Sequence, residues 1–479
     1  MITAARLPGH WAAFAAGFLL LVAAPARAAE LRDADSIAQE YIAAAITSNL
    51  ALQGQRLETE RAQAALAAAR ARFLPEIALQ ARYTRADGGR SIDFPVGALL
   101  NPAYQTLNEL LVAQGLPPRF TALPDVSIPF QREREQDTRI TLRQPLYQPA
   151  IPASVRGQRE LLRGSHAAEQ ALAAQLRRDV YLAYLNWLKA RRAHSLLENS
   201  RELLDENLRV NQSLLRNGRI TEDQVLRAQT EQLAVVQQIR EAQNGIEQAR
   251  SYVNFLLNRP LDTPLEDARD GIAAAPLSAP ADLRQASDRR PELQQLDALA
   301  AAADAQRQAA RAALQPSLSL GIDAGTQGES WHVGPGYNFA AASLVFNWKF
   351  FDGGANRAEA DRAGLAARQA RLRQQALTQQ IGLEMQQARD QLAASTDSLA
   401  VAETRAAAAA AALRIAQRKR DAGSISQVEF LDARSAQTAA ELSLIVTRFE
   451  LLQRRVELQY AMGELSGTAA VAQGSAGNE

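Results

Sequence analysis

The chain has 479 residues, of which 53 are basic and 52 acidic, and its formal net charge of +1 argues against a nucleic-acid-binding surface. It contains no cysteine, which excludes disulfides, thiolate metal sites, cysteine nucleophiles and a lipid anchor on an N-terminal cysteine. Apolar residues make up 47% of the chain, which is ample for a core, although not obviously for one compact domain.

The first 28 residues predict an export signal. Arg6 forms a short positive region, Trp11 to Ala24 form an apolar run, and Ala26 to Ala28 form a small-residue cleavage site. The apolar run is too short to span a bilayer, and no later segment reaches the roughly 18 to 20 uncharged apolar residues that a spanning helix needs. We therefore expect cleavage after Ala28 and an exported mature protein.

An internal repeat organises the rest of the chain. Asn49–Pro75 lines up with Arg290–Pro316 at an offset of 241 residues, and each segment reads as a helix stopped by proline. The segments that begin at Leu142 and Phe346 line up at an offset of only 204 residues. The smaller offset predicts an insertion of about 37 residues in the first half, within Thr84–Asp137, and this insertion includes a possible short amphipathic helix.

These boundaries predict a domain layout with two similar halves. The layout is a signal peptide at 1–28, a first structural repeat at 29–258, an equatorial linker at 259–291, a second structural repeat at 292–462 and a flexible C-terminal tail at 463–479. After an opening helix, the first repeat should contain strands at about 76–84 and 138–147, a long helix at 152–216, a tip turn at 217–220 and a return helix at 221–258. The second should contain strands at about 317–326 and 338–350, a long helix at 355–420, a tip turn at 421–425 and a return helix at 426–462.

The extended segments show the period of two that is typical of a strand with one apolar face. Leu318, Leu320 and Ile322, for example, alternate with serine, glycine and aspartate. Two ordinary hairpins on a soluble sheet are one interpretation. The other is a transmembrane barrel wall with interfacial aromatic residues, namely Tyr147, Trp348, Phe350 and Phe351. Because open sheet edges cannot face lipid, the barrel interpretation requires several chains to pool four strands each.

The two long helices would each reach roughly 100 Å at 1.5 Å per residue. Small and apolar residues recur along the first one in a narrow stripe, which is typical of helices that pack side by side: Ala168, Leu172, Leu176, Val180, Tyr184 and Trp187. Gly218 and Gly423 suit helix C-termini, where a left-handed residue is favoured. Capping boxes are predicted next, at Thr221 with Gln224 and at Ser426 with Glu429. The turns would thus be the tips of two helical hairpins.

The duplicated layout and the paired tips, GRITEDQVLRA from Gly218 and GSISQVEFLDA from Gly423, resemble the TolC family of outer-membrane efflux and secretion channels. The resemblance covers about Asp35 to Met462. It implies a mainly α-helical chain with a membrane β-barrel, in which a homotrimer pools twelve strands above a periplasmic α-helical tunnel. By analogy the proline-rich linker and the chain ends would form a belt around the tunnel. The first outer hairpin is longer than this family's pattern.

The resemblance also implies a function and partners. The chain would be the outer-membrane component of a tripartite efflux or type I secretion system, located in the Gram-negative outer membrane and extending into the periplasm. Its partners would be its own copies, a periplasmic adaptor (membrane fusion) protein, an inner-membrane transporter of the RND, ABC or MFS type, and outer-membrane lipid. No nucleic acid is expected.

Family channels close at the periplasmic tip and carry paired acidic residues six and nine positions after the glycine of the second-half turn. The resemblance therefore implies a gate at Glu429 and Asp432, which would form two carboxylate rings in a trimer. The capping box alone accounts for Glu429, and a solvated helix position is the alternative for Asp432. The first-half equivalents, Gln224 and Arg227, depart from the acidic pattern, and Arg227 would instead pair with a neighbouring acid. The tips themselves are candidate adaptor-docking residues: Gly218, Ile220, Gly423 and Ile425.

Nothing in the sequence predicts catalysis, a cofactor or a metal site. His166, His194 and His332 are scattered without ligand spacing. Two other classes of protein were weighed, a periplasmic coiled-coil adaptor and a structural spacer, but neither needs two hairpins together with aromatic-rich alternating strands. The sequence does not determine the exported substrate.

Overall fold

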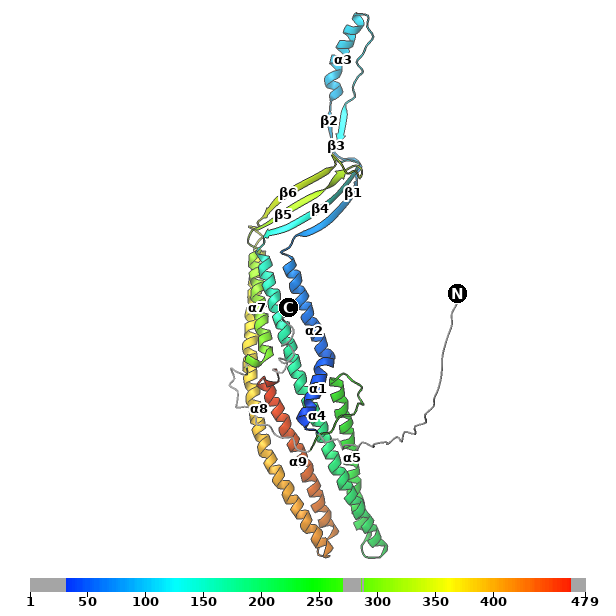
Figure 1. The fold of residues 1–479 in the computed structure, drawn as a ribbon, viewed down its shortest axis with the longest axis vertical. Helices are drawn as coiled ribbons and strands as arrows, with labels where there is room; N and C mark the ends of the chain where they lie inside the picture. The colour runs from blue at the N-terminus through cyan, green and yellow to red at the C-terminus, as the bar shows by residue number, and fades with distance from the viewer. Residues whose placement is uncertain (1–31, 270–285, 287, 467–479) are drawn as a thin grey trace, which may run out of the picture.

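The computed structural model describes residues 32–269, 286 and 288–466. Figure 1 shows an elongated molecule with long helices at one end, a four-stranded sheet beyond them, and a narrow extension projecting from the far side of the sheet. The signal peptide predicted at 1–28 lies outside the described residues. So do residues 270–285 and 287 of the predicted linker and residues 467–479 of the predicted tail.

Both halves contain a helix, two sheet strands, a long helix and a return helix in that order. The first half contains α1 (Ala34–Ser48), α2 (Leu50–Ala71), β1 (Glu76–Arg85), β2 (Ser91–Phe94), α3 (Val96–Ala113), β3 (Val126–Pro129), β4 (Arg134–Tyr147), α4 (Ala150–Arg216) and α5 (Glu222–Leu256). The second contains α7 (Pro291–Ala312), β5 (Ser317–Gly328), β6 (Asn338–Asn347), α8 (Ala355–Asp421), α9 (Gln427–Ala461) and a short 3₁₀ helix (Glu464–Ser466). The first half has α1, β2, α3 and β3 in addition. Helices α4 and α8 have 67 residues each, and α5 and α9 have 35 each.

Small residues let helix α4 pack closely on helix α7. A Cβ at Gly157 would lie 3.6 Å from the Ala305 Cβ, and a Cβ at Gly164 would lie 3.4 Å from the Ala298 Cβ. The two glycines are seven residues apart on α4, and the two alanines are seven residues apart on α7. Seven residues are two helical turns, so the same face of each helix meets its neighbour twice. The predicted α4 stripe is also confirmed, because its last four residues are buried: Leu176, Val180, Tyr184 and Trp187.

The largest core lies midway along the helices, where the segment after α5 crosses α1 and α4. The Tyr41 and Tyr184 rings meet edge to face with centroids 5.4 Å apart, and Trp187 stacks on Tyr184 at 5.9 Å. The Tyr184 hydroxyl donates to the Glu266 carbonyl at 2.9 Å, and the Glu266 N–H donates to the Tyr41 hydroxyl at 2.9 Å. Both phenols are thereby satisfied by the backbone of the crossing segment, which fixes that segment against the helices.

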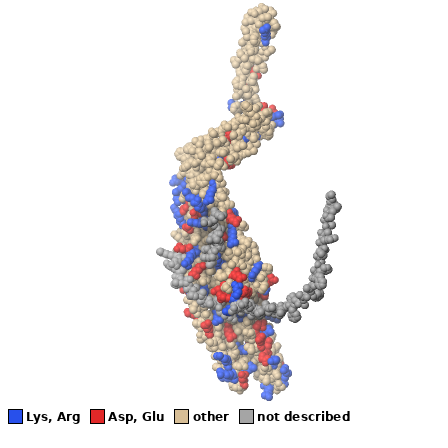
Figure 2. Space-filling view, viewed as in Figure 1, with Lys and Arg blue, Asp and Glu red and all other residues tan. Residues whose placement is uncertain are grey.

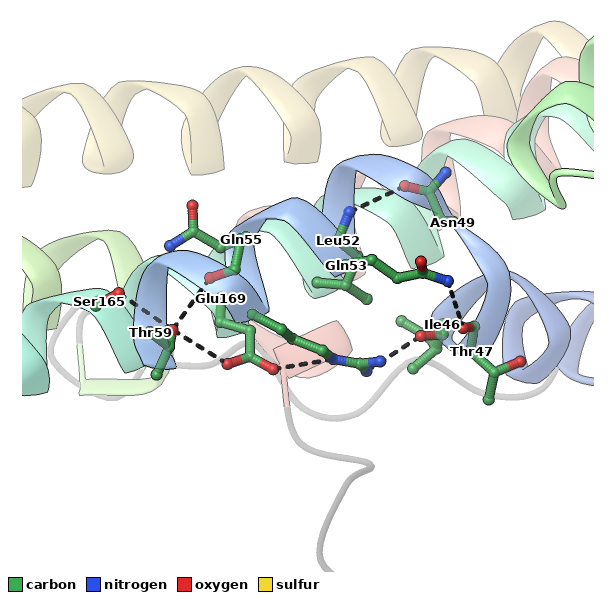
Figure 3. A network of polar contacts seen from close by, with 10 residues as sticks. Ile46, Thr47, Asn49, Leu52, Gln53, Gln55, Thr59, Ser165 and Glu169 are labelled. Atoms are coloured by element: carbon green, nitrogen blue, oxygen red, sulfur yellow. Dashed lines mark hydrogen bonds and ion pairs between the residues drawn. The ribbon is translucent and has the colours of Figure 1, made fainter. Parts of the chain in front are cut away.

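A polar network fixes the break between α1 and α2 against α4 (Figure 3). The Asn49 side chain caps α2 by accepting from the Leu52 N–H at 3.2 Å. One turn further on, the Arg56 guanidinium donates both to Glu169 of α4 at 3.2 Å and to the Ile46 carbonyl at 3.1 Å. The Thr59 hydroxyl, which is buried, reaches Ser165 of α4 at 3.1 Å. The network holds the first half of α2, at the end away from β1.

Two strand boundaries differ from the sequence prediction. Strand β4 begins at Arg134 rather than 138, because the ladder with β1 continues to the pair Arg85 and Arg134. Strand β6 ends at Asn347 rather than 350, so Trp348, Phe350 and Phe351 lie in the connection to α8. Gly353 and Gly354 in this connection have φ angles of 67° and 90°, which turn the chain into the helix.

Candidate functional site

The sheet joins the two halves of the chain in the order β1-β4-β5-β6, with every neighbouring pair antiparallel. Strands β4 and β5 come from different halves, yet they form a register that runs from Gln136 opposite Gly328 to Tyr147 opposite Leu318. Within the described chain, β1 and β6 each keep one edge without a partner strand. An unpaired edge exposes a row of backbone donors and acceptors that must be satisfied elsewhere.

One face of the sheet is apolar and exposed. The register brings apolar side chains opposite one another across all four strands, in the rows Ile77–Leu142–Ile322–Ala342 and Leu79–Ile140–Ala324–Ala340. Leu79, Phe346 and Leu344 are 72%, 64% and 65% exposed, respectively. On the side of the sheet visible in Figure 2 few charged side chains appear, whereas the helical part carries many. An uncharged sheet face of this kind favours contact with lipid or with another protein.

The opposite face is polar. It carries rows such as Ala78–Thr141–Asp323–Ala341, and it holds a buried carboxylate, Asp137, whose side chain is 3% exposed. Arg139 Nε donates to Asp137 Oδ1 at 3.0 Å, and Arg82 Nη2 lies 3.5 Å from Asp137 Oδ2. The pairing satisfies the buried charge, as burial of a carboxylate requires. The two faces therefore differ as the two sides of a membrane barrel wall differ.

Exposed aromatic residues gather where the sheet meets the helices. Tyr147 ends β4, and Trp348, Phe350 and Phe351 follow β6 with exposures of 53%, 84% and 81%. The Trp348 indole N–H donates to the Leu314 carbonyl at 3.2 Å, and its ring lies edge to face with Phe350 at 6.3 Å. An apolar ring with its polar group bonded at one end of a strand suits a membrane–water interface.

The two tips have the same backbone structure. After α4, the Gly218 N–H donates to the Leu215 carbonyl and the Arg219 N–H to the Leu214 carbonyl, both at 2.9 Å. After α8, the Gly423 N–H donates to the Arg420 carbonyl and the Ser424 N–H to the Lys419 carbonyl, both at 2.8 Å. This pair of bonds is the Schellman motif, and it needs a left-handed residue, which the glycines provide with φ angles of 69° and 68°. The predicted glycine stops are confirmed.

The capping predictions are half right. The Ser426 hydroxyl accepts from the Glu429 N–H at 3.2 Å, so it caps α9 as expected. The prediction at the first tip is wrong: Thr221 occupies the N-cap position, but its side chain makes no capping bond to Gln224. The Gln224 N–H instead donates to the Thr221 backbone carbonyl at 3.2 Å.

The candidate gate residues are exposed at the start of the return helices. Glu429 and Asp432 lie in the first two turns of α9, three residues apart, and both side chains are exposed. Arg227 is exposed near the start of α5 and makes no ion pair within the described part of the chain. Of the candidate docking residues, Ile220 is half-buried at its tip, whereas Ile425 packs against the cluster that includes Phe430 and Leu431. Geometry within one chain thus leaves the side chains of Glu429, Asp432 and Arg227 available to neighbours, whereas Ile425 already packs within its own chain.

Basic residues surround the acidic pair at the second tip. Arg418, Lys419 and Arg420 occupy the last turn of α8, where cations complement the helix dipole, and Figure 2 shows basic side chains at the lower ends of the helices. The Arg420 guanidinium lies 4.2 Å from the Phe430 ring centroid. Burial, together with the nearby Arg420 charge, lowers the pKa of Arg434, and its buried Nε has no hydrogen-bond partner in the described residues. A carboxylate from outside the chain would satisfy it.

A polar seam between α4 and α9 was not predicted. Asn207 is buried, accepts from Gln427 at 2.8 Å and accepts from Asn211 at 3.1 Å. Further from the tip, Ser200 meets Thr438 at 3.2 Å and Asn186 accepts from Gln453 at 2.8 Å. Ser200 and Asn207 are seven residues apart, and this spacing of polar residues in an apolar stripe was the available signal.

Two features are absent from the described residues. No group of three or more His, Asp or Glu side chains there could hold a metal ion, and no helix there is long and apolar enough to cross a membrane.

Part of the chain is similar to outer-membrane efflux proteins. Residues 283–464 match the family model described as "Outer membrane efflux protein". Over 210 residues the chain is 30% identical to the "Probable efflux pump outer membrane protein TtgC" and to the "Antibiotic efflux pump outer membrane protein ArpC", both of Pseudomonas putida. Each match covers 42% of this chain and 42% of the relative, so the chain spans less than half the length of the curated relatives it matches.

Solved structures of outer-membrane channels share the fold. The outer-membrane channel OprN aligns with a TM-score of 0.75 and 19% identity over 90% of both chains. CusC aligns with a TM-score of 0.75 and 17% identity over 90% of this chain and 93% of its own, and the open state of Neisseria gonorrhoeae MtrE aligns with 0.72 and 20% over 89% of both. The resemblance predicted from the duplicated layout is thereby confirmed.

Proposed function

We propose that this chain, which carries an outer membrane efflux protein domain over residues 283–464, is the outer-membrane channel component of a tripartite efflux or type I secretion system. One observation carries the proposal. A sheet with one exposed apolar face, one polar face and two unpaired edges lies above long helical hairpins. Lipid suits the apolar face, a water-filled lumen suits the polar face, and neighbouring copies suit the edges.

The copy number follows from the edges and from the family resemblance. Four strands cannot close alone, and unpaired edges cannot face hydrocarbon. Three chains would pool twelve strands, with β1 of one chain beside β6 of the next, and the helices would continue the barrel as a tunnel into the periplasm. An internal duplication accounts for the equal lengths of α4 and α8 and of α5 and α9.

The same reasoning extends to partners and localisation. We infer an outer-membrane protein that reaches into the periplasm and docks, through its tips, with a periplasmic adaptor and an inner-membrane transporter. The residues proposed for docking are those that turn the two tips: Gly218, Ile220, Gly423 and Ile425. The matched family consists of efflux channels, so the chain itself would supply a duct, while the transporter would supply the energy.

The proposed gate is the acidic pair of the second tip. In a trimer Glu429 and Asp432 would form two stacked rings with six carboxylates around the entrance, and Arg434 and Arg227 would each find an acid of a neighbouring copy. Arg434 supports this role because its buried Nε has no hydrogen-bond partner among residues 32–269, 286 and 288–466. Rings of carboxylates attract cations and repel one another, so an opening motion that separates them is favoured.

Detergent extraction followed by cross-linking tests the proposal. We expect the mature protein in the outer-membrane fraction, as a trimer that requires detergent and forms ion-conducting channels in planar bilayers. A monomer that is stable in water without detergent would refute both the proposed barrel and the proposed channel.

Topology has a separate test. If Pro75 and Tyr147 mark the periplasmic side, the extension lies outside the cell, and the exposed Arg119 on its return segment should be the first site cut by trypsin added to intact cells. Cleavage there only after the outer membrane is opened would reverse the topology.

A further inference from the structure

The extension between β1 and β4 is a built unit rather than a passive loop. It consists of β2, α3, a return segment at 114–125 and β3, and it projects beyond the sheet (Figure 1). It holds the predicted amphipathic helix, which was expected from Asn101 but begins at Val96, with Pro102 inside it.

Side-chain hydrogen bonds join α3 to the return segment at three levels, two from side chains of α3 and one from a side chain of the return segment. Asn101 both donates to the Leu123 carbonyl at 2.9 Å and accepts from the Leu123 N–H at 2.8 Å. Seven residues on, Asn108 does the same with the backbone of Phe120, at 2.7 and 3.1 Å. Asp125 caps the helix, since its Oδ1 accepts from the Gly97 N–H at 2.9 Å. Backbone groups of an otherwise unpaired segment are thus satisfied, and one face of α3 is fixed.

A second face of α3 is apolar and has no partner in the described chain. Its residues follow one another at steps of four and three, the spacing of a coiled-coil seam: Val96, Leu100, Ala103, Leu107 and Leu110. Leu100, Leu107 and Leu110 are 41%, 43% and 56% exposed. The opposite flank carries Gln105 and Glu109 instead. We call the five residues the α3 stripe.

The charge pattern favours identical partners for the α3 stripe. Glu109 is the only charged residue of α3, and it lies on the flank away from the stripe. Copies of the helix can therefore meet without repulsion between like charges, and no charged partner is selected. The stripe is also continuous with the proposed contact between copies, because only five residues, 86–90, separate the edge strand β1 from β2.

We propose that the three α3 helices of one channel pack on each other through the α3 stripe and form a three-helix bundle beyond the barrel mouth. The inference rests on the trimer of the proposed function. Two heptads are too short to assemble as free peptides, but attachment to one barrel raises the effective concentration of the helices to about the millimolar range.

The dimensions allow this bundle. Twelve strands about 4.8 Å apart and tilted by about 40° close into a barrel roughly 24 Å across, so three evenly spaced points on its rim are about 20 Å apart. Packed helices are about 8–10 Å apart, and each α3 must therefore lean inward by roughly 6 Å. The 18 residues of α3 span about 27 Å, over which such a lean is a small tilt.

The absence of cysteine gives a clean test. Leu107→Cys is compared with Glu109→Cys, which lies on the opposite flank, in purified trimers under mild oxidation. Disulfides need Cα atoms within about 7 Å, so we expect at least about fivefold more linked dimer from Leu107→Cys. Adding Leu100→Asp and Leu110→Asp should abolish that gain, whereas adding Gln105→Asp should preserve it. None of these changes should alter the amount of trimer, which the strands hold together.

Each outcome decides the inference. Intact trimers with no disulfide at Leu107→Cys, or with equal disulfide on both flanks, would overturn the bundle and leave the proposed channel standing. Protection of Leu107→Cys from a water-soluble maleimide only when lipid is present, without disulfide, would assign the stripe to the membrane and also overturn it. Failure of the unmodified chain to form a trimer would overturn the channel and the bundle together.

Discussion

The apolar face of the sheet makes a quantitative prediction about assembly. Leu79 is the fourth of ten residues in β1, is 72% exposed and stands opposite Ile140 on the apolar face. Arginine on the lipid face of a barrel at mid-depth costs about 2–4 kcal/mol. Three copies of Leu79→Arg would therefore destabilise the inserted trimer by about 6–12 kcal/mol, which is at least about a 10⁴-fold loss in the assembly constant.

The neighbouring residue provides a matched control. Gln80 lies on the polar face of the same strand, opposite Arg139. Like charges directly opposite each other cost up to about 1 kcal/mol, so Gln80→Arg should cost at most about 3 kcal/mol per trimer. The pairing of Arg139 with Asp137 reduces this repulsion further.

The assay is the amount of heat-labile, detergent-resistant trimer in outer membranes and after refolding into vesicles. We expect trimer from Gln80→Arg and none from Leu79→Arg, with both chains exported equally. Equal trimer from the two variants would refute the assignment of the apolar face to lipid, and loss from Gln80→Arg alone would invert it.

Three other expectations concern the tips and the first helix. Gly423→Ala should lower the free energy of unfolding by about 1–2 kcal/mol, because φ at Gly423 is 68°. Gly54→Ala, at an exposed position of α2, should raise the free energy of unfolding by about 0.5–1 kcal/mol. Denaturant titration in detergent compares the two variants, and equal effects would contradict the tip geometry. Glu429→Ala with Asp432→Ala should preserve the trimer but weaken cation selectivity and block by multivalent cations in single-channel recordings; unchanged selectivity and block would remove both residues from the constriction. Burial of the Asp35 carboxyl, and next the nearby Asp33, raises the pKa of Asp35, so the contribution of Asp35 to stability is fully present below its unfolded pKa and is lost as the pH rises through its folded pKa. Asp35→Asn should therefore raise the melting temperature at pH 7. An equally large rise in the melting temperature at pH 3 would argue against burial as the cause.

Local patterns in the sequence determined which residues form the turns and which residues share one face of a strand. The helix stops at Gly218 and Gly423 were predictable, because a stop that uses a left-handed glycine depends only on residues nearby in the sequence. The alternation of apolar residues in β1, β4, β5 and β6 was likewise readable, since it depends only on a period of two. The resemblance to outer-membrane channels followed from the repeated layout of these elements.

Partners distant in the sequence could not be read from the same patterns. Periodicity predicted that β4 has an apolar face, but not that β4 would pair with β5 about 170 residues away and join the two halves in one sheet. Asn207 looked like any polar residue of a long helix until α9 brought Gln427 to it. In the extension, Asp125 became the cap of a helix that begins 29 residues earlier.

The physical reason is the range of each interaction. Backbone dihedral preferences, turn motifs and the facing of side chains act within one or two turns of chain, so the sequence alone determined the helices, the strands and the two tips. Which surfaces meet depends on the summed burial and polar pairing of segments far apart in the chain, and no local pattern contains that sum. Only the tertiary structure therefore decided that Thr221 would not cap its helix, that β6 would end before Trp348, and that the α3 stripe would remain without a partner in the part of its own chain that the structure describes.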